Sequence, residues 1–481
     1  MLFNSYAFIF AFLPITLLGY FTLNHFKQVT LGKVWLILAS LYFYSFWNIN
    51  NLPLLLTSIG VNFLIGRYLR QGVSKKNLFR LGLLFNLGLL GFFKYANFTI
   101  LNINWLLELK LNPIVAFLPL GISFFTLQQV GYLVDSYEGL TEEKSFIDYS
   151  LFVSFFPQLI SGPIVRYTQM MPQVEDKNNK RFNLDKFSLG IFIFCLGLVK
   201  KVLISESFSG WARPGFDEMP SLDLLAAWKT SLSYTFQLYF DFSGYTDMAI
   251  GIGHMFNLKL PQNFNSPYRS KSIIEFWSRW HITLSQFITT YIFTPIVRAM
   301  PKINFRNTMI ATFIAMLIAG VWHGAGWTFV AYGALHGLAL VINHKWKKKK
   351  KKLPSWLAWF ITFNFINVSF VLFRAKNMQD AFKVLRGMIG LDGVIVPKIG
   401  VKSVGLLSDY GFKMGTYLYP QDYLMIVMML VSFYVALKMK NSLDLEKKFK
   451  PQGKLAFACG VMFALSLFGM NKITEFIYFN F

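Results

Sequence analysis

Long runs of apolar residues, separated by short basic or turn-forming segments, dominate this sequence. A helix that crosses a bilayer needs about 20 consecutive apolar residues, and the runs approach that length. They predict roughly 11 or 12 membrane segments, of which those interrupted by proline or glycine are expected to be re-entrant or tilted. The approximate windows are 4–23, 31–48, 52–66, 79–93, 113–134, 147–165, 187–204, 226–256, 283–297, 309–341, 356–374, 423–437 and 455–470.

Basic residues in the short turns predict how the chain is oriented. The turn 67–80 and the lysine-rich segments 345–352 and 438–454 are basic, whereas the turn 48–52 carries no charge. Cytoplasmic loops are enriched in lysine and arginine, so these basic turns are expected on the inner side of the membrane. Counting the spans outward from them places both chain ends on the outer face. The basic segment 374–421 also falls outside in this scheme, which is tolerated because longer segments follow the charge rule poorly.

Composition places the chain in the polytopic membrane class. Of 481 residues, 54% are hydrophobic and only 15% are charged, so a single integral membrane domain over 1–481 is expected, with a motif-bearing core at 113–375 and C-terminal helices and tail at 423–481. The net charge of +24 lies in turns that contact membrane lipids, which argues against nucleic-acid binding. Cys195 and Cys459 lie in apolar runs and indicate neither a disulfide framework nor a thiolate metal site.

A histidine set among glycines and tryptophans is the most unusual feature of the apolar runs. Trp322 and His323 are followed by Gly-Ala-Gly-Trp, and the apolar stretch continues to Leu340. An ionisable side chain at membrane depth is a candidate functional residue, because it usually faces a protein interior or a water-filled cavity. The alternative is a neutral histidine that only ties helices together.

Two segments put polar groups where a lipid-facing helix would not tolerate them. Segment 119–135 carries Gln128, which either lines a site or joins helices by hydrogen bonds. Segment 239–247 carries Tyr239, Asp241, Tyr245 and Asp247. Its two carboxylates require partners, which arginine or histidine elsewhere in the chain would supply, and a purely structural buried network is the alternative.

Segment 269–285 combines basic and histidine side chains. Arg269, Lys271 and Arg279 precede or enter a predicted helix, and His281 and Ser285 share one face of it. Guanidinium and ammonium groups of this kind suit the phosphates of an anionic ligand.

Several chemistries find no support in the motifs. The sequence has no H-E-x-x-H pattern, no clustered Cys/His spacing, no G-x-S-x-G elbow and no nucleotide-binding glycine loop, so no metal is expected. On one unbroken helix, His323 and His336 would point about 220° apart and would not chelate one ion.

The motifs Arg279-Trp-His-Ile-Thr-Leu-Ser285 and Trp322-His-Gly324 closely resemble the membrane-bound O-acyltransferase family. The segments 119–125 and 239–245 resemble its bacterial branch, which contains alginate and peptidoglycan O-acetyltransferases and the teichoic acid D-alanylation protein. The resemblance covers nearly the whole chain. It implies an all-α polytopic fold that forms a ring around a funnel or tunnel, with His323 as the catalytic histidine and His281 as the second one.

The resemblance also implies a function for a multi-pass protein of the bacterial cytoplasmic membrane. Acetyl-CoA would be the cytosolic donor, with Arg269, Lys271 and Arg279 as candidate contacts for its phosphates. The acetyl group would pass to an extracytoplasmic SGNH-type partner and then to a polysaccharide acceptor. The Lys-, Asn-, Ile- and Phe-rich composition, typical of an AT-rich genome, favours peptidoglycan over alginate as that acceptor. The alternatives are D-alanyl transfer to teichoic acid, an acyl-group transporter or flippase, and a non-catalytic scaffold.

The C-terminal segment Glu475-Phe-Ile-Tyr478-Phe-Asn-Phe481 adds a further candidate. It is similar to the aromatic C-terminal motif of the small partner in the teichoic acid system, in which the tyrosine is thought to relay the acyl group. Tyr478 is therefore a candidate acyl carrier, and an interfacial aromatic anchor is the alternative.

Overall fold

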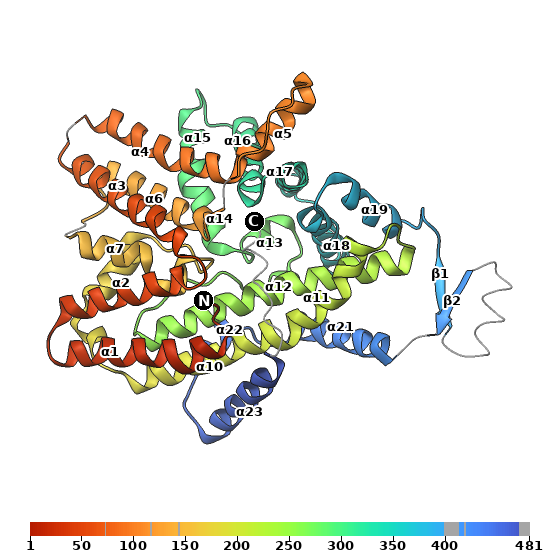
Figure 1. The fold of residues 1–481 in the computed structure, drawn as a ribbon. Coiled ribbons are helices and arrows are strands. Elements are labelled where there is room, and N and C mark those ends of the chain that lie inside the picture. Colours follow the sequence, from red (N-terminus) through yellow and green to blue (C-terminus); the bar gives the residue numbers. More distant parts are fainter. Residues whose placement is uncertain (73, 116–117, 143–144, 399–412, 418–419, 471–481) are drawn as a thin grey trace.

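The computed structural model describes residues 1–72, 74–115, 118–142, 145–398, 413–417 and 420–470. Within these ranges the chain is almost entirely helical, with one short parallel strand pair at its edge (Figure 1). The helices of the first part are α1 (Leu13–His25), α2 (Val29–Ser45), α3 (Leu52–Arg70), α4 (Lys75–Leu90), α5 (Ala96–Leu107), α6 (Ile122–Tyr137), α7 (Phe146–Ser154), α8 (Phe156–Leu159), α9 (Tyr167–Glu175), α10 (Leu184–Leu198) and α11 (Glu206–Arg213).

The remaining elements are α12 (Leu224–Met255), α13 (Ile273–Trp277), α14 (Ile282–Ile288), α15 (Thr294–Ala299), α16 (Phe305–His323), α17 (Trp327–Lys348), α18 (Ser355–Arg374), α19 (Met378–Met388), β1 (Ile395–Lys398), β2 (Lys413–Tyr417), α21 (Pro420–Lys438), α22 (Ser442–Lys447) and α23 (Gly453–Gly469). Wider π-helical turns interrupt or extend several of them. These turns are Phe8–Phe12, Gly91–Tyr95, Val199–Ser205, Pro214–Glu218 and Thr289–Phe293.

The all-α polytopic architecture predicted from the sequence is confirmed. Six stretches of the described chain are long and apolar enough to cross a membrane: Phe8–His25, Ile49–Arg70, Lys75–Leu107, Leu184–Glu218, Phe305–His323 and Ser355–Arg374. Two shorter apolar helices, Val29–Ser45 and Gly453–Gly469, accompany them. The total of roughly 11 or 12 spans and the ring around a tunnel stay predictions.

Two predicted windows differ from the helices observed. The window 309–341 is two antiparallel helices, α16 and α17, because the backbone is extended at both Gly324 and Gly326. The window 113–134 becomes helical only at Ile122, after Gly121 adopts a left-handed conformation with φ 70°. As the prolines of 147–165 predicted, that window is broken between α7 and α8.

Helix α12 runs through the centre of the molecule and packs against α10 through two pairs of glycines (Figure 1). Gly190 lies against Gly251, and Gly197 lies against Gly244, so the glycines are seven residues apart on both helices. A Cβ added at Gly251 would come within 2.6 Å of the Gly190 carbonyl oxygen. The backbones of α10 and α12 therefore approach as closely as small residues allow, which is a common way for membrane helices to associate.

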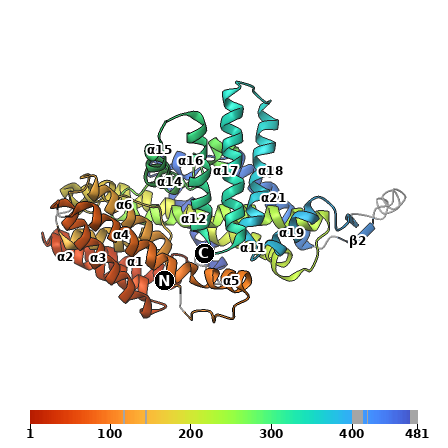
Figure 2. The same cartoon turned by 90° about the horizontal axis from the view of Figure 1, so that it is seen from above.

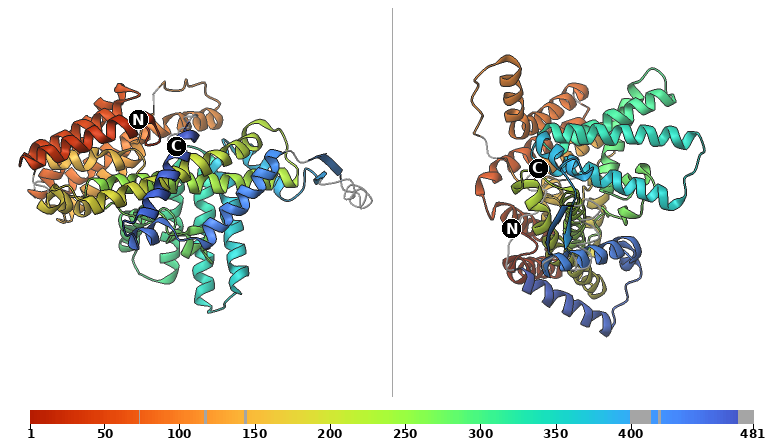
Figure 3. Two further views of the ribbon diagram at one scale, coloured as in Figure 1. Left: turned by 90° about the horizontal axis from the view of Figure 1, so that it is seen from below. Right: turned by 90° about the vertical axis from the view of Figure 1, so that its right-hand side faces the viewer.

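The other helices surround this pair unevenly. Helices α16, α17 and α18 stand side by side and project from the rest of the molecule in Figure 2. Helix α23 packs at the edge of the molecule, against α10 and the turn that follows it (Figure 3). The N-terminal helices α1 to α4 pack together at one end, with α6 and α7 behind them.

Gly251→Leu is expected to lower the free energy of unfolding by about 1–3 kcal/mol, because its side chain would push α10 and α12 apart. Thermal unfolding of the purified protein in detergent measures the effect. Gly60→Leu in α3 is the matched control, since an added Cβ there meets no described atom within 4 Å. Equal stability of the two variants would contradict the close contact.

Candidate functional site

His323 is the last residue of α16, at the break before α17. Its side chain is buried, with 4% of its surface exposed. The imidazole packs among aromatic rings, with ring-centre distances of 5.0 Å to Trp322, 5.1 Å to Phe373 and 6.2 Å to Tyr332. The break places His323 and His336 on different helices, so the angle calculated for one unbroken helix does not apply.

Lys94, from the π-helical turn Gly91–Tyr95, holds the end of α16 in place. Its ammonium donates hydrogen bonds to the carbonyl oxygens of Trp322 at 2.6 Å and His323 at 3.0 Å, and to the Ser123 hydroxyl at 3.0 Å. The neighbouring Tyr95 hydroxyl donates to the Val321 carbonyl at 2.7 Å. The last carbonyls of a helix lack intrahelical partners and carry partial negative charge, so a cation is favourable there.

The first polar segment meets His323 through its N-terminal part. The Trp322 indole donates to the Ser123 carbonyl at 3.3 Å, and its ring packs against Phe124 at 5.6 Å. Gly121, at the start of this segment, lies against the end of α8, where an added Cβ would come within 3.1 Å of the Leu159 carbonyl oxygen. The motif beginning at Pro119 therefore forms one wall of the His323 site.

Gln128 does not join helices as one interpretation of the sequence expected. The neighbouring Gln129 does so: its amide donates to the Ser58 hydroxyl at 2.8 Å and accepts from Tyr149 at 3.1 Å. Gln128 is 4% exposed, and its side-chain oxygen has no hydrogen-bond partner among the described residues. It lines a small cavity together with Arg166.

His281 is fully buried immediately before α14, in a left-handed conformation with φ 43°. Such a conformation costs roughly 1–3 kcal/mol in a non-glycine residue and persists where surrounding contacts fix it. Asn263 supplies these contacts by accepting hydrogen bonds from the Ile282 amide at 3.0 Å and from the Thr283 hydroxyl at 2.6 Å. The imidazole packs edge-on against Phe242 at 4.7 Å.

The structure brings His281 and His323 into one neighbourhood. His281, Lys94 and His336 all lie close enough to act electrostatically on the His323 imidazole. Ser285 does not extend this group toward His323, because its hydroxyl donates to the Trp280 carbonyl at 3.4 Å. Lys94 was not among the residues predicted from the sequence. Like His323, it is an ionisable residue inside an apolar stretch, here 81–107, and could have been recognised as a candidate for that reason.

His336 is engaged at both ring nitrogens, in agreement with a structural role. The Trp277 indole donates to its Nδ1 at 3.2 Å, and its Nε2 lies 3.0 Å from the Ser369 hydroxyl. The Ser369 hydroxyl donates its proton to the Ile366 carbonyl at 2.8 Å, so it accepts a hydrogen bond from Nε2. The proton of the neutral imidazole is therefore assigned to Nε2.

The carboxylates of α12 are paired with lysines rather than with the expected arginine or histidine. Asp241 contacts Lys201 at 2.5 Å, and Asp247 contacts Lys200 at 2.5 Å. Both lysines come from the turn Val199–Ser205 that follows α10, and neither was predicted from the sequence. Ser442 also donates to Asp247 at 2.7 Å, so the pairs tie α10, α12 and α22 together.

The two tyrosines of this segment serve packing. Tyr239 packs against Trp280, with ring centres 6.3 Å apart, and thereby supports the residue before His281. Tyr245 stacks on Phe3 at 4.8 Å. The segment 239–247 is therefore a buried network beside the histidine site.

The basic residues predicted to meet phosphates contact protein groups in this structure. Arg269 donates to the carbonyls of Ala436 at 3.4 Å and of Met439, near the end of α21. Lys271 is exposed and contacts Ser355 at 3.2 Å. Arg279 is paired with Glu275 at 3.0 Å and also donates to the Asn265 carbonyl at 3.1 Å. Tyr478 lies outside the described residues.

Comparison with known proteins gives the class of this multi-pass protein. Residues 69–379 match the model of the membrane-bound O-acyltransferase family. The chain belongs to that family and is an O-acyltransferase, as its motifs predicted. The family implies an acyl donor.

Named relatives include a peptidoglycan O-acetyltransferase of Helicobacter pylori, which is 44% identical over 100% of this chain and 98% of its own length. A probable alginate O-acetylase of Pseudomonas aeruginosa is 37% identical over 81% of this chain and 75% of its own length. A teichoic acid D-alanyltransferase of Bacillus subtilis is 33% identical, over 53% of this chain and 69% of its own length.

Lys94→Met is expected to reduce acyl transfer and to lower the unfolding free energy by about 2 kcal/mol, because it removes charged hydrogen bonds from the end of α16. Turnover and thermal unfolding of the purified protein measure the two effects. Lys351→Met, in the exposed lysine run, is the control and should change neither. Wild-type turnover in Lys94→Met would contradict a role for Lys94 in positioning His323.

Proposed function

We propose that this chain transfers an acetyl group from acetyl-CoA to an acceptor outside the cytoplasmic membrane, with peptidoglycan as the favoured acceptor. The observation that carries the proposal is the buried His323, anchored by Lys94 at a helix break and within electrostatic reach of His281. The 44% identity to a peptidoglycan O-acetyltransferase along the full chain supports the acceptor. D-alanyl transfer has weaker support, because the teichoic acid relative matches only 53% of the chain.

In this proposal His323 is the general base. Its neutral imidazole takes the proton from an acceptor hydroxyl, whose oxygen attacks the thioester carbonyl carbon. The carbon–sulfur bond then breaks, and the proton passes from His323 to the departing CoA thiolate. His281 would orient the thioester or stabilise the negative charge that develops on its oxygen. The strained backbone of His281 and the anchored end of α16 keep the two imidazoles in fixed positions.

The donor would enter from the cytosolic side. Arg269, Lys271 and Arg279 remain the candidates for its phosphates, and Lys271 is the most accessible because it is exposed. Arg269 would have to exchange carbonyl contacts for phosphate, which is favourable because bonds between two charged groups are stronger than bonds to neutral carbonyls. Arg279 would have to share its guanidinium between phosphate and the Glu275 carboxylate.

On the outer face an SGNH-type esterase or transferase would receive the acetyl group and pass it to the glycan. Tyr478 would carry the group between His323 and that partner, through an ester on its phenolic oxygen. Support for the relay comes from the aromatic sequence 475–481 and from the predicted outer position of the C-terminal tail.

His323→Ala should reduce acetyl transfer by about 100-fold or more, the usual contribution of a general base. Release of free CoA from labelled acetyl-CoA by the purified protein, with its acceptor present, measures the loss. His25→Ala is the matched control, because His25 is exposed at the end of α1 and distant in sequence from the motifs. Transfer that survives in His323→Ala at the rate of the control would overturn the assignment.

Tyr478→Phe tests the relay, because the ring stays and only the hydroxyl is removed. Loss of the covalent acetyl label from the protein, together with loss of transfer to the glycan, is the expected result. Mass spectrometry of the C-terminal peptide after incubation with labelled acetyl-CoA detects the ester. If glycan acetylation continues unchanged, the tail is an anchor, and the role proposed for His323 is unaffected.

A further inference from the structure

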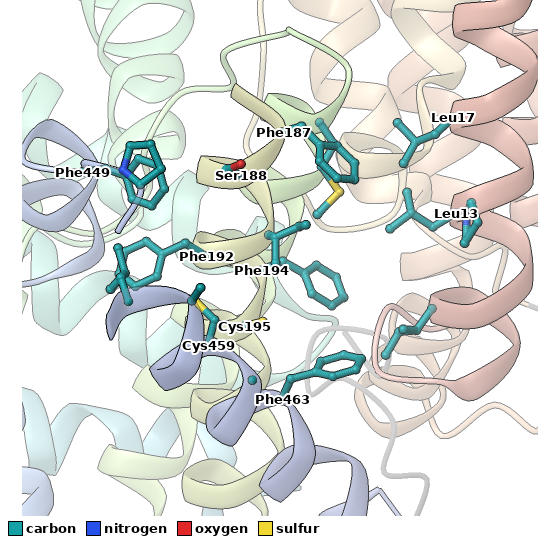
Figure 4. Close-up of a pocket in the computed structure, with 18 of the residues that line it drawn as sticks. Leu13, Leu17, Phe187, Ser188, Phe192, Phe194, Cys195, Phe449, Cys459 and Phe463 are labelled. Carbon is teal, nitrogen blue, oxygen red and sulfur yellow. The ribbon is translucent and has the colours of Figure 1, made fainter. Parts of the chain in front are cut away.

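A large apolar cavity opens between α1, α10 and α23 (Figure 4). Its volume is about 1210 Å³. Leu13 and Leu17 line it from α1, Phe194 from α10, and Cys459 and Phe463 from α23. Pockets for small ligands usually measure about 300–1,000 Å³, so this cavity suits a larger apolar molecule.

Contacts at both ends of α23 attach this helix to the rest of the protein beside the cavity. At the outer end, the Tyr6 hydroxyl donates to the Leu467 carbonyl at 2.8 Å, and Phe10 packs on Phe463 at 6.1 Å. At the inner end, just before α23, Phe449 packs on Phe192 of α10 at 5.5 Å. Between these ends α23 packs on one side of α10, and the cavity lies between α23, α10 and α1.

Two basic stretches of the sequence adjoin the inner mouth of the cavity, and the first of them also contains Asp185. Phe182 and Phe449 line that mouth, and each lies in a basic stretch of the sequence. The exposed basic residues of these two stretches are Lys177, Arg181, Lys447, Lys448, Lys450 and Lys454. The inner leaflet of a membrane is anionic, and each lysine or arginine near its surface adds about 1 kcal/mol of attraction.

The cavity is long enough to hold the acyl chains of one leaflet. Along α1 and the turn before it, the lining extends from Thr22 to Ile9, which is about 20 Å at the helical rise. One leaflet contributes about 15 Å of the roughly 30 Å hydrocarbon core.

We propose that this cavity is a binding site for one anionic phospholipid of the inner leaflet. Its acyl chains lie against α1, α10 and α23, and its phosphate lies between the basic stretches 177–186 and 447–454. The site is separate from the histidine site and does not depend on acyl transfer. The lipid fills space that would otherwise separate α23 from the protein, and so supports the helix that leads to the C-terminal tail.

Gly460→Trp tests the site by filling it. Gly460 lines the cavity, and an added Cβ meets no described atom within 4 Å, so the new side chain enters open space. Native mass spectrometry in detergent, with dioleoylphosphatidylglycerol as the probe, should show retention of the lipid falling about tenfold. Gly88→Trp is the matched control on α4, since Gly88 is exposed and equally uncrowded among described atoms, and it should retain lipid like the wild type.

A second measurement leaves Gly460 unchanged and places a fluorophore in the cavity. The chain has two cysteines, and both line the cavity, so Cys195→Ser leaves Cys459 as a single thiol for a bimane fluorophore. Brominated phosphatidylglycerol should quench this fluorophore at lower lipid concentration than brominated phosphatidylcholine does. Lys448→Glu combined with Lys450→Glu should abolish the difference.

Three results would overturn the proposal. One is retention of phosphatidylglycerol by a folded Gly460→Trp variant at the wild-type level. Another is equal quenching by the two brominated lipids, which would mean that the cavity takes hydrocarbon without recognising a headgroup. The third is a lipid-free dimer that dissociates in Gly460→Trp, because the cavity would then bind a second copy of the chain.

Discussion

Inside hydrocarbon, a helix that stops must still satisfy its last carbonyl groups, and water is not there to do it. At the end of α16 this task falls to Lys94 and Tyr95, which reach the carbonyls of Val321, Trp322 and His323. Without these donors the break before α17 would cost several kcal/mol in unsatisfied groups. The break in turn allows His323 to sit at a helix end, where its ring faces Phe373 and Tyr332. The histidine site therefore depends on a lysine from a distant part of the chain.

The framework around this site depends on α12. Paired glycines bring α10 against it, and the turn after α10 then places Lys200 and Lys201 opposite Asp247 and Asp241. Buried ion pairs gain little stability compared with apolar contacts, but breaking one by removing a single partner is costly. These pairs consequently fix the register of α10 against α12.

The helical class and the segments that surround the site could be predicted from the sequence, because both follow from local patterns. The apolar windows correspond to helices, and the polar groups at 119–135 and 239–247 are buried as expected. The phosphate contacts, inferred from basic side chains at 269–279, and the Tyr478 relay, inferred from resemblance, stay predictions.

Long-range partners could not be predicted from the sequence. Lys94 bonds to a carbonyl 229 positions away, and Lys201 pairs with a carboxylate 40 positions away, so neither partner is visible in local spacing. The break within 309–341 was missed because Gly324 and Gly326 lie in an apolar run, where glycine also occurs in continuous membrane helices. Gln128 and Gln129 are adjacent, and their different roles depend on which one faces Ser58.

The length of helix α17 indicates how deep in the membrane the histidine site lies. From Trp327 to Lys345, where the lysine run begins, the helix rises about 27 Å, close to the full thickness of about 30 Å of hydrocarbon. If the lysines stay at the inner surface, His323 lies nearer the outer surface, by an amount that the tilt of α17 sets. In the proposed function, a cytosolic thioester would then travel most of the way across the bilayer. The proposed acceptor on the outer face would have only a short distance to reach the histidine.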